Sequence, residues 1–315
     1  MSTDAGRVVL LAGGTGGGKL AAGLQELVGE RLTVVVNTAD DLEMHGLAIT
    51  PDPDLVTYWL SGVIDEQRGW GIRDDGFAAS GWLERLGAPG WFQLSDRDLA
   101  TCLFRTAFRA EGGSYTEVTA RIAAALGARA TVLPMSEQPV RCRVKTRDGW
   151  RELQQFLILD RGEGTIEDVE LTGIEAAEAT PEVAAAVAAA ETIVIAPSNP
   201  VISIGPILRV AGIREAIAAT AAPVTAVSPL VGGRSVKGPT EAFVASTGRP
   251  VSAAGVADLY AGVIDAMVVD EGDPEPGPAE IPVLACATLM DDAAGRRRVA
   301  SEVLEFARGL GARRR

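Results

Sequence analysis

Short, uninterrupted runs of apolar residues recur along the chain and alternate with segments of helical periodicity. Between the first two runs, for example, Leu20, Leu24 and Leu27 recur at helical spacing. Strands that are apolar at every position and are joined by helices are typical of a parallel sheet covered on both faces. We therefore expect an α/β fold, Rossmann-like, with a mostly parallel sheet and helices on both faces. The predicted buried strands are Val8–Ala12, Leu32–Val36, Thr192–Ala196, Val224–Val227 and Met267–Val269.

The middle of the chain departs from this alternation. Residues 58–112 read as helix and loop and contain four of the five tryptophans, which can either face a flat ligand or pack in the core. The economical division is a Rossmann-like core made of residues 1–57 and 175–315, with residues 58–174 as a helical and β-rich insertion or lid. The elements predicted in the second half of this insertion are a helix at Tyr115–Leu126 and strands at Val140–Thr146, Trp150–Leu159 and Val169–Ile174.

The composition of the 315-residue chain suits a large aliphatic core, because 47% of its residues are apolar. The formal net charge of −13 argues against a protein that holds nucleic acid by bulk charge. The three cysteines form no CxxC pair, so neither a disulfide framework nor a zinc site is expected. The longest apolar runs, such as Ala184–Ala190, are far too short to span a membrane. We expect a cytoplasmic protein with no membrane or nucleic-acid partner.

The first predicted strand runs into a glycine-rich turn. Gly13, Gly14, Thr15 and Gly16 lead to Lys19, and a helical pattern begins at the next residue. Backbone N–H groups and the positive end of a helix dipole converge in such a turn, so it can bind a phosphate group. The spacing is neither that of a dinucleotide-binding fingerprint nor that of a P-loop. Ordinary close packing of the helix is the alternative interpretation.

An acidic turn follows the second predicted strand. Asn37, Asp40 and Asp41 lie there, and Asp52 and Asp54 come shortly after. The carboxyl ends of neighbouring parallel strands share one edge of the sheet, so this turn is expected beside the glycine-rich turn. Several carboxylates near a phosphate site can hold Mg²⁺, which prefers oxygen ligands. Alternatively, these aspartates cap the next segment and open a helix after two prolines.

Two later strand ends carry small polar or basic residues. The turn after Thr192–Ala196 contains Ser198, Asn199 and Ser203, which can bond a base, a ribose or a phosphate or simply stabilise the turn. The turn after Val224–Val227 contains Ser228 and ends in a basic stretch. The chain has a single histidine, with no G-x-S-x-G motif, so any proton transfer falls more plausibly to an aspartate.

Four segments in order carry a resemblance to a known family. They are Gly13–Gly16 with Lys19, Val36–Asp41, Leu94–Asp98 and Ala196–Ile207. Together they are similar to the 2-phospho-L-lactate transferase family of coenzyme F-420 biosynthesis, whose actinobacterial branch is called phosphoenolpyruvate transferase. The resemblance runs from Val8 to about Leu310, and the Ser-Asn-Pro-x-x-Ser-Ile-Gly-Pro run is its most specific motif.

The resemblance implies a Mg²⁺-dependent reaction of two small molecules. The donor is lactyl-2-diphospho-5′-guanosine or its enolpyruvyl analogue, and the acceptor is the terminal ribityl hydroxyl of the deazaflavin Fo, with release of GMP. It implies roles for Asp54, Asp40 and Asp41 in catalysis, with Asp54 and Asp40 at the metal, and a homodimer. The implied substrate-binding residues are Gly13, Gly14, Thr15, Gly16, Lys19, Asn37, Asp96, Arg97, Ser198, Asn199, Pro200, Ser203, Gly205, Ser228, Gly232 and Lys237.

Two other functions compete with this interpretation. A related family of non-catalytic regulators that bind nucleotide sugars shares the Gly-Gly-Thr-Gly start and the acidic turn, but needs no Fo pocket. A nicotinamide-dependent dehydrogenase would need a different glycine spacing. The chain also departs from the transferase pattern at Leu55, where the family often has threonine, so no hydroxyl contact is expected there.

Overall fold

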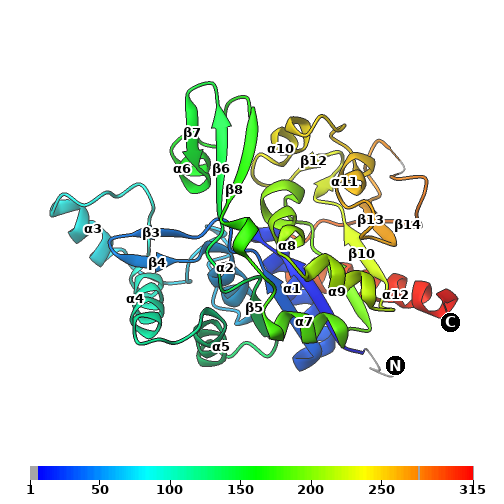
Figure 1. Cartoon of the computed structure of the whole chain (residues 1–315), viewed down its shortest axis with the longest axis horizontal. Helices are drawn as coiled ribbons and strands as arrows, with labels where there is room; N and C mark the ends of the chain where they lie inside the picture. The colour runs from blue at the N-terminus through cyan, green and yellow to red at the C-terminus, as the bar shows by residue number, and fades with distance from the viewer. Residues whose placement is uncertain (1–5, 276, 315) are drawn as a thin grey trace.

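A fully parallel sheet of seven strands forms the centre of the computed structural model, which describes residues 6–275 and 277–314 (Figure 1). Each neighbouring pair in it is parallel, as the apolar runs predicted. The α/β, Rossmann-like fold is therefore confirmed. From one edge to the other, the strands are β14 (Val283–Cys286), β13 (Ala266–Asp270), β10 (Val224–Val227), β9 (Thr192–Ile195), β1 (Val8–Ala12), β2 (Leu32–Val36) and β5 (Thr131–Pro134).

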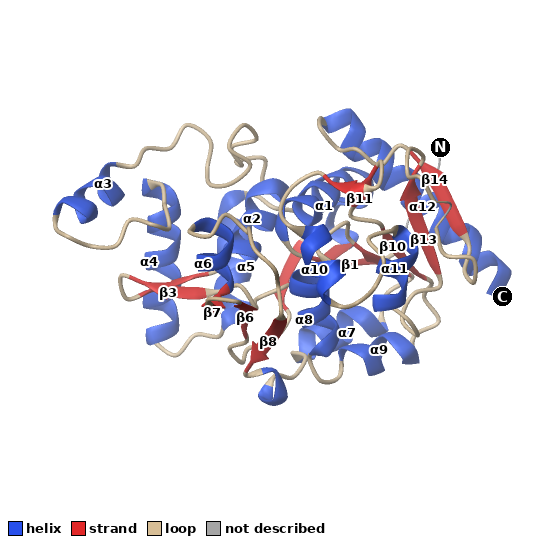
Figure 2. Ribbon diagram, turned by 90° about the horizontal axis from the view of Figure 1, so that it is seen from above, coloured by secondary structure: helices blue, strands red, loops and turns tan. Residues whose placement is uncertain are grey.

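Helices cover both faces of this sheet, and Figure 2 shows them on its two sides. One layer consists of α1 (Gly14–Val28), α2 (Pro51–Leu60), α5 (Tyr115–Leu126) and α12 (Ala293–Arg314). The other consists of α7 (Pro181–Ala188), α8 (Gly205–Arg209), α9 (Ile213–Ala219), α10 (Thr240–Ser246) and α11 (Ala253–Leu259). Short 3₁₀ turns lie at Gly29–Arg31 and Ile174–Ala176. Within the described residues, no helix combines the length and the apolar character needed to cross a bilayer.

Alternation along β1 explains why both layers are needed. Leu10 and Ala12 pack into the core beneath α1, α2 and α12, whereas Val9 and Leu11 pack into the opposite core beneath α7–α11. All four side chains are buried. Since successive side chains of a strand point to opposite faces, an unbroken apolar run requires apolar cover on both sides.

Two smaller units project from this core, as Figure 1 shows on the left and at the top. The first contains the hairpin β3 (Leu42–Met44) and β4 (Leu47–Ile49) with α3 (Ala78–Arg85) and α4 (Asp96–Ala110). The second contains β6 (Arg141–Thr146), β7 (Gly149–Glu152), α6 (Leu153–Ile158) and β8 (Asp168–Thr172). A further pair, β11 (Leu230–Val231) and β12 (Arg234–Ser235), follows β10.

The structure differs from the sequence prediction in several elements between β2 and α7. Strand β5 lies inside the range 58–174 expected to form the insertion, yet it pairs with β2 in the main sheet. The predicted strand Trp150–Leu159 ends at Glu152 and continues as a helix, because Leu153 and Phe156 lie three residues apart and are buried on one side. The hairpin β3–β4 was not predicted, and the only histidine lies exposed in its turn.

The glycine-rich stretch is mostly helix rather than loop. Helix α1 begins at Gly14, six residues before the predicted start. A Cβ on Gly16 would lie 2.2 Å from the carbonyl oxygen of Pro197, and one on Gly18 would lie 2.3 Å from Cδ1 of Trp59. Glycine at these positions therefore permits close packing. Gly14, with φ of +63° and open space around it, is the position that serves the turn itself.

The same close packing predicts opposite effects for one substitution at two helical glycines. A Cβ on Gly23 of α1 would lie 2.3 Å from the carbonyl oxygen of Arg296 in α12, whereas one on Gly81 of α3 meets nothing within 4 Å. Gly23→Ala should lower the free energy of unfolding by about 1–3 kcal/mol. Gly81→Ala should raise it by about 0.5–1 kcal/mol, because alanine loses less backbone entropy in a helix. Urea unfolding measures both, and equal effects would contradict this account of α1–α12 packing.

Candidate active site

The sheet order reverses beside β1, which pairs with β2 on one side and with β9 on the other. In open α/β sheets, ligands bind outside the carboxyl ends of the strands at such a switch point. One buried side chain joins the two strand ends here. The Ser198 hydroxyl donates to the carbonyl oxygen of Gly13 (2.6 Å) and accepts from its N–H (3.3 Å). The glycine turn and the loop after β9 therefore form the walls of one crevice.

A cavity of about 430 Å³ occupies this crevice. It brings together residues from the ends of β1, β2, β9 and β10 that lie far apart in the sequence. The predicted site residues that line it are Gly13, Gly14, Thr15, Gly16, Lys19, Asp40, Ser198, Asn199, Ser203, Ser228 and Lys237. Four other predicted residues, Asn37, Pro200, Gly205 and Gly232, do not line this cavity. The loop after β9 is a π-helical turn at Pro200–Ile204, and Asn199 caps it by accepting from two N–H groups.

A second cavity of about 640 Å³ opens beside the first. Its wall is rich in aromatic side chains, including those of Tyr58, Trp70, Trp91 and Phe92. The two cavities share a common stretch of wall. The shared residues are Gly14, Thr15, Asp40, Asp52, Leu157 and Lys237.

Asn37 organises the carboxylates at this junction. Its Nδ2 group donates to Oδ2 of Asp52 (3.0 Å) and more weakly to Oδ1 of Asp40 (3.4 Å). Its side-chain oxygen Oδ1 accepts a hydrogen bond from the N–H of Ala39. The N–H of Gly14 donates to Oδ1 of Asp52 (2.6 Å), and Gln154 donates to Oδ2 of Asp40 (3.1 Å). Both carboxylates are thus held in place from several directions.

Asp40 and Asp52 are two neighbouring carboxyl groups without a positively charged partner in the described part of the chain. Burial raises the pKa of Asp52 to about 6. Burial also raises the pKa of Asp40, and the neighbouring charges of Asp52 and Asp41 raise it further. In the described part of the chain, neither residue forms an ion pair with lysine or arginine. Two adjacent, oriented carboxylates without a counter-ion are suitable ligands for a divalent cation.

Asp54, by contrast, already has a counter-ion. Its carboxylate forms an ion pair with the guanidinium group of Arg105, and both side chains are buried. Arg105 also donates to the carbonyl oxygen of Ala48 (3.2 Å). Asp54 lines the second cavity, but its charge is balanced within the protein. The role at the metal inferred for it from the resemblance stays a prediction. Asp52, which the sequence groups with the carboxylates that can hold Mg²⁺ but which the resemblance did not assign to the site, lines both cavities.

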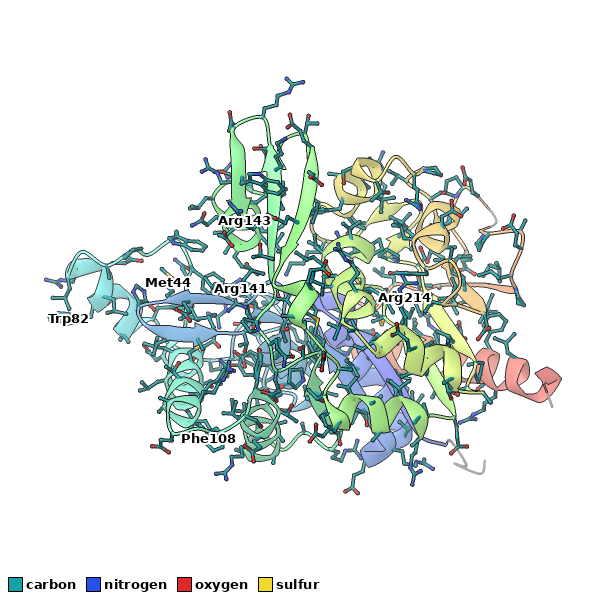
Figure 3. The ribbon with its side chains drawn as sticks, in the orientation of Figure 1. Met44, Trp82, Phe108, Arg141, Arg143 and Arg214 are labelled. Carbon is teal, nitrogen blue, oxygen red and sulfur yellow. The ribbon has the colours of Figure 1, made fainter. Side chains whose placement is uncertain are left out.

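Asp41 lies on the far side of Asp40 from these two cavities. Its Oδ2 accepts from the hydroxyl of Tyr115 (2.8 Å), and burial raises its pKa to about 8. It lines a smaller cavity of about 260 Å³ together with Arg141, which Figure 3 shows near the centre of the molecule. Asp40 also borders this smaller cavity, so Asp40 lines all three cavities, whereas Asp41 lines the smallest of them alone.

Two lysines bring positive charge to the first cavity. The Nζ group of Lys237 lies 3.4 Å from Oγ1 of Thr15, at the N-terminus of α1, and 3.4 Å from the carbonyl oxygen of Gly69. Burial lowers the pKa of Lys237, and the charge of Lys19 lowers it further. Burial is also the main cause of the lowered pKa of Lys19. Two mutually repelling cations beside a helix N-terminus favour the binding of an anion.

The segment Leu94–Asp98 contributes differently from the prediction. The carboxylate of Asp96 accepts from the N–H groups of Ala78 and Ala79 and so caps α3. Arg97 is exposed and lies beside Asp75. Neither Asp96 nor Arg97 lines the two cavities described above.

The four tryptophans of residues 58–112 lie in three different environments. Trp70 and Trp91 line the second cavity, whereas Trp59 is buried against Gly18. Trp82, labelled in Figure 3, is 60% exposed at the tip of the projecting unit. The structure thus leaves two of the four as candidates for contact with a flat ring.

Comparison with known proteins identifies the family. Residues 8–281 match the family model described as "2-phospho-L-lactate transferase CofD". The chain belongs to this family. It is 40% identical to the 2-phospho-L-lactate transferase of Methanosarcina mazei over 267 residues, covering 84% of this chain and 88% of that protein. It is 38% identical to the phosphoenolpyruvate transferase of Streptomyces griseus over 312 residues, covering 96% and 98%.

Family membership makes the protein a transferase of coenzyme F-420 biosynthesis. Among solved structures, a UPF0052-family protein from Bacillus halodurans has a similar fold, with a TM-score of 0.63 at 18% identity. That similarity covers 95% of this chain and 98% of the Bacillus chain. At this level of identity it supports the fold alone.

The buried ion pair makes a prediction about stability. Asp54→Asn leaves the Arg105 guanidinium buried without a counter-ion, so it should lower the free energy of unfolding by about 3 kcal/mol. Adding Arg105→Met should recover at least half of this loss. Unfolding in guanidinium chloride measures the free energy of unfolding of each variant. Asp148→Asn, in an exposed turn, is the control. Wild-type stability of Asp54→Asn would contradict the structural role of this pair.

Proposed function

We propose that the two cavities hold the two substrates of a single transfer reaction. A phosphoenolpyruvyl or 2-phospho-L-lactyl group passes from a guanosine diphosphate adduct to the terminal ribityl hydroxyl of Fo. The hydroxyl oxygen forms a bond to the phosphorus that carries the three-carbon acid and releases its proton to the solvent. The bond from that phosphorus to the oxygen of GMP breaks, and GMP leaves with the electron pair of that bond. The observation that carries this proposal is the shared wall, where Gly14, Asp52 and Lys237 border both cavities.

The first cavity suits the guanosine donor. It lies at the switch point of the sheet and combines the N-terminus of α1 with Lys19 and Lys237. These groups offer backbone N–H groups and positive charge to a diphosphate. Small polar side chains at the ends of β9 and β10, such as Ser203 and Ser228, line the same cavity and can bond the ribose or the base.

The second cavity suits the deazaflavin. Trp70, Trp91 and Phe92 offer apolar faces against which a flat ring can stack. The cavity reaches the shared wall at Asp40 and Asp52. A ligand whose ring lies among the aromatic side chains can therefore extend its ribityl chain to the phosphorus of the donor.

Mg²⁺ fits the Asp40–Asp52 pair, because both carboxylates are buried, oriented and without a counter-ion. When bound, the ion would neutralise negative charge on the phosphoryl oxygens. Asn37 holds the two carboxylates in position, and the lysines orient the diphosphate. Phosphoryl transfer depends chiefly on such positioning and electrostatic stabilisation.

An assay with defined substrates tests the proposal. The protein with Fo, Mg²⁺ and either the lactyl or the enolpyruvyl guanosine donor should form a phosphodiester product and GMP in equal amounts, as measured by mass spectrometry. Omitting Mg²⁺ should abolish the product. If neither donor yields GMP and Fo does not bind, the proposed transferase reaction is wrong. The better interpretation is then a non-catalytic regulator that binds a nucleotide sugar.

The proposed metal site predicts that turnover and Mn²⁺ binding depend on Asp52 but not on the exposed Asp148. Asp52→Asn should lower kcat by about 100-fold or more and weaken the binding of Mn²⁺, used as a probe for Mg²⁺. The variant should stay folded, since asparagine still accepts from Gly14 and no buried cation loses its partner. Calorimetric titration with Mn²⁺ and steady-state kinetics measure these effects, with Asp148→Asn as the matched control. Unchanged Mn²⁺ affinity in Asp52→Asn would contradict the assignment.

A further inference from the structure

One carboxylate of the second cavity has no role in the reaction described so far. Asp98 lies in the first turn of α4 and is only 8% exposed. Its Oδ1 accepts from the hydroxyl of Tyr58 (2.7 Å), and both residues line the second cavity. Among the described residues, none donates a hydrogen bond to its Oδ2. This oxygen is not one of the enclosed, unpartnered atoms either, so it is open to the cavity.

The surroundings of Asp98 do not balance its charge. Its carboxylate lies within 4.8 Å of that of Asp54. The nearby guanidinium of Arg105 forms its ion pair with Asp54. Burial raises the pKa of Asp98 to about 7, and the charge of Asp54 contributes to this increase. A buried acceptor with a free oxygen is costly unless a ligand supplies a donor.

The position of Asp98 fits the far end of the acceptor. Asp52, at the shared wall, and Tyr58, which holds Asp98, lie six residues apart on α2, or roughly 9 Å along the helix. The wall of the same cavity carries the aromatic side chains of Trp70, Trp91 and Phe92. A ligand with its reacting hydroxyl at Asp52 would therefore place the rim of its ring near Asp98.

We propose that Asp98 recognises the acceptor by accepting a hydrogen bond from the imide N–H of its deazaflavin ring. This inference rests on the proposed function, because it assumes that the second cavity binds Fo. Tyr58 acts as a positioning residue that holds Oδ1 and leaves Oδ2 for the ligand. Asp98 is thus a specificity-determining residue, which selects rings with a donor at this edge over those without one.

A binding cycle tests the proposal with Fo and its N-methylated imide derivative, which lacks the donor. Equilibrium dialysis measures the dissociation constants for the wild type and for Asp98→Asn. In the wild type, methylation should weaken binding about 10- to 100-fold, and Asp98→Asn should weaken the binding of Fo by a similar factor. In the variant, methylation should weaken binding less than it does in the wild type, because the uncharged amide oxygen of asparagine is a weaker acceptor than the carboxylate.

The controls separate this inference from the proposed function. Asp148→Asn, the same change in an exposed turn, should bind Fo like the wild type. If wild-type protein binds methylated and unmethylated Fo equally well, the role of Asp98 is wrong, whether or not the variant folds. Equal binding of Fo by the wild type and Asp98→Asn would overturn it as well. If the wild type binds no Fo at all, the proposed function itself fails.

Discussion

The burial of four aspartates at the carboxyl end of one sheet is the constraint on which the rest of this structure depends. Asp40, Asp41, Asp52 and Asp54 are each less than 9% exposed. Arg105 neutralises Asp54, the Tyr115 hydroxyl holds Asp41, and Asn37 bridges the remaining two. Burying a charge without a partner is costly. The helices and turns that carry Arg105, Tyr115 and Asn37 must therefore pack where these side chains reach the aspartates. The pair left without a counter-ion is the pair at the junction of the two cavities.

Helices α2 and α4 meet through this charge arrangement rather than through an apolar seam. Asp54 and Tyr58 lie one turn apart on α2, and they contact Arg105 and Asp98, which lie two turns apart on α4. These contacts tie the projecting unit to the core. Asp54, Tyr58 and Asp98 also line the aromatic cavity, so residues that stabilise the unit also shape this cavity.

Close approach of backbones has a comparable role around β1. Gly16 allows α1 to contact the loop after β9, and Ser198 then bonds both backbone groups of Gly13. The crevice is therefore built by short contacts between segments about 185 residues apart, the sequence separation of Gly13 and Ser198. Family membership agrees with this arrangement, since the matched residues 8–281 include both walls.

The apolar runs predicted five of the seven strands of the sheet, and the ordered motifs predicted the family. Apolar runs such as Val8–Ala12 require cover on both faces, and the order of the motifs is a property of the chain alone. The packing of the folded chain determined which of the two aspartates at the start of α2 has a counter-ion. The residue pattern did not distinguish Asp52 from Asp54, because both open the same helix, and of these two the resemblance assigned a metal role to Asp54. Successive helical positions point in different directions, so Asp52 faces Asn37 and Asp54 meets Arg105, which is 51 residues away. Local periodicity predicts burial, whereas a partner that distant in the chain is chosen by packing.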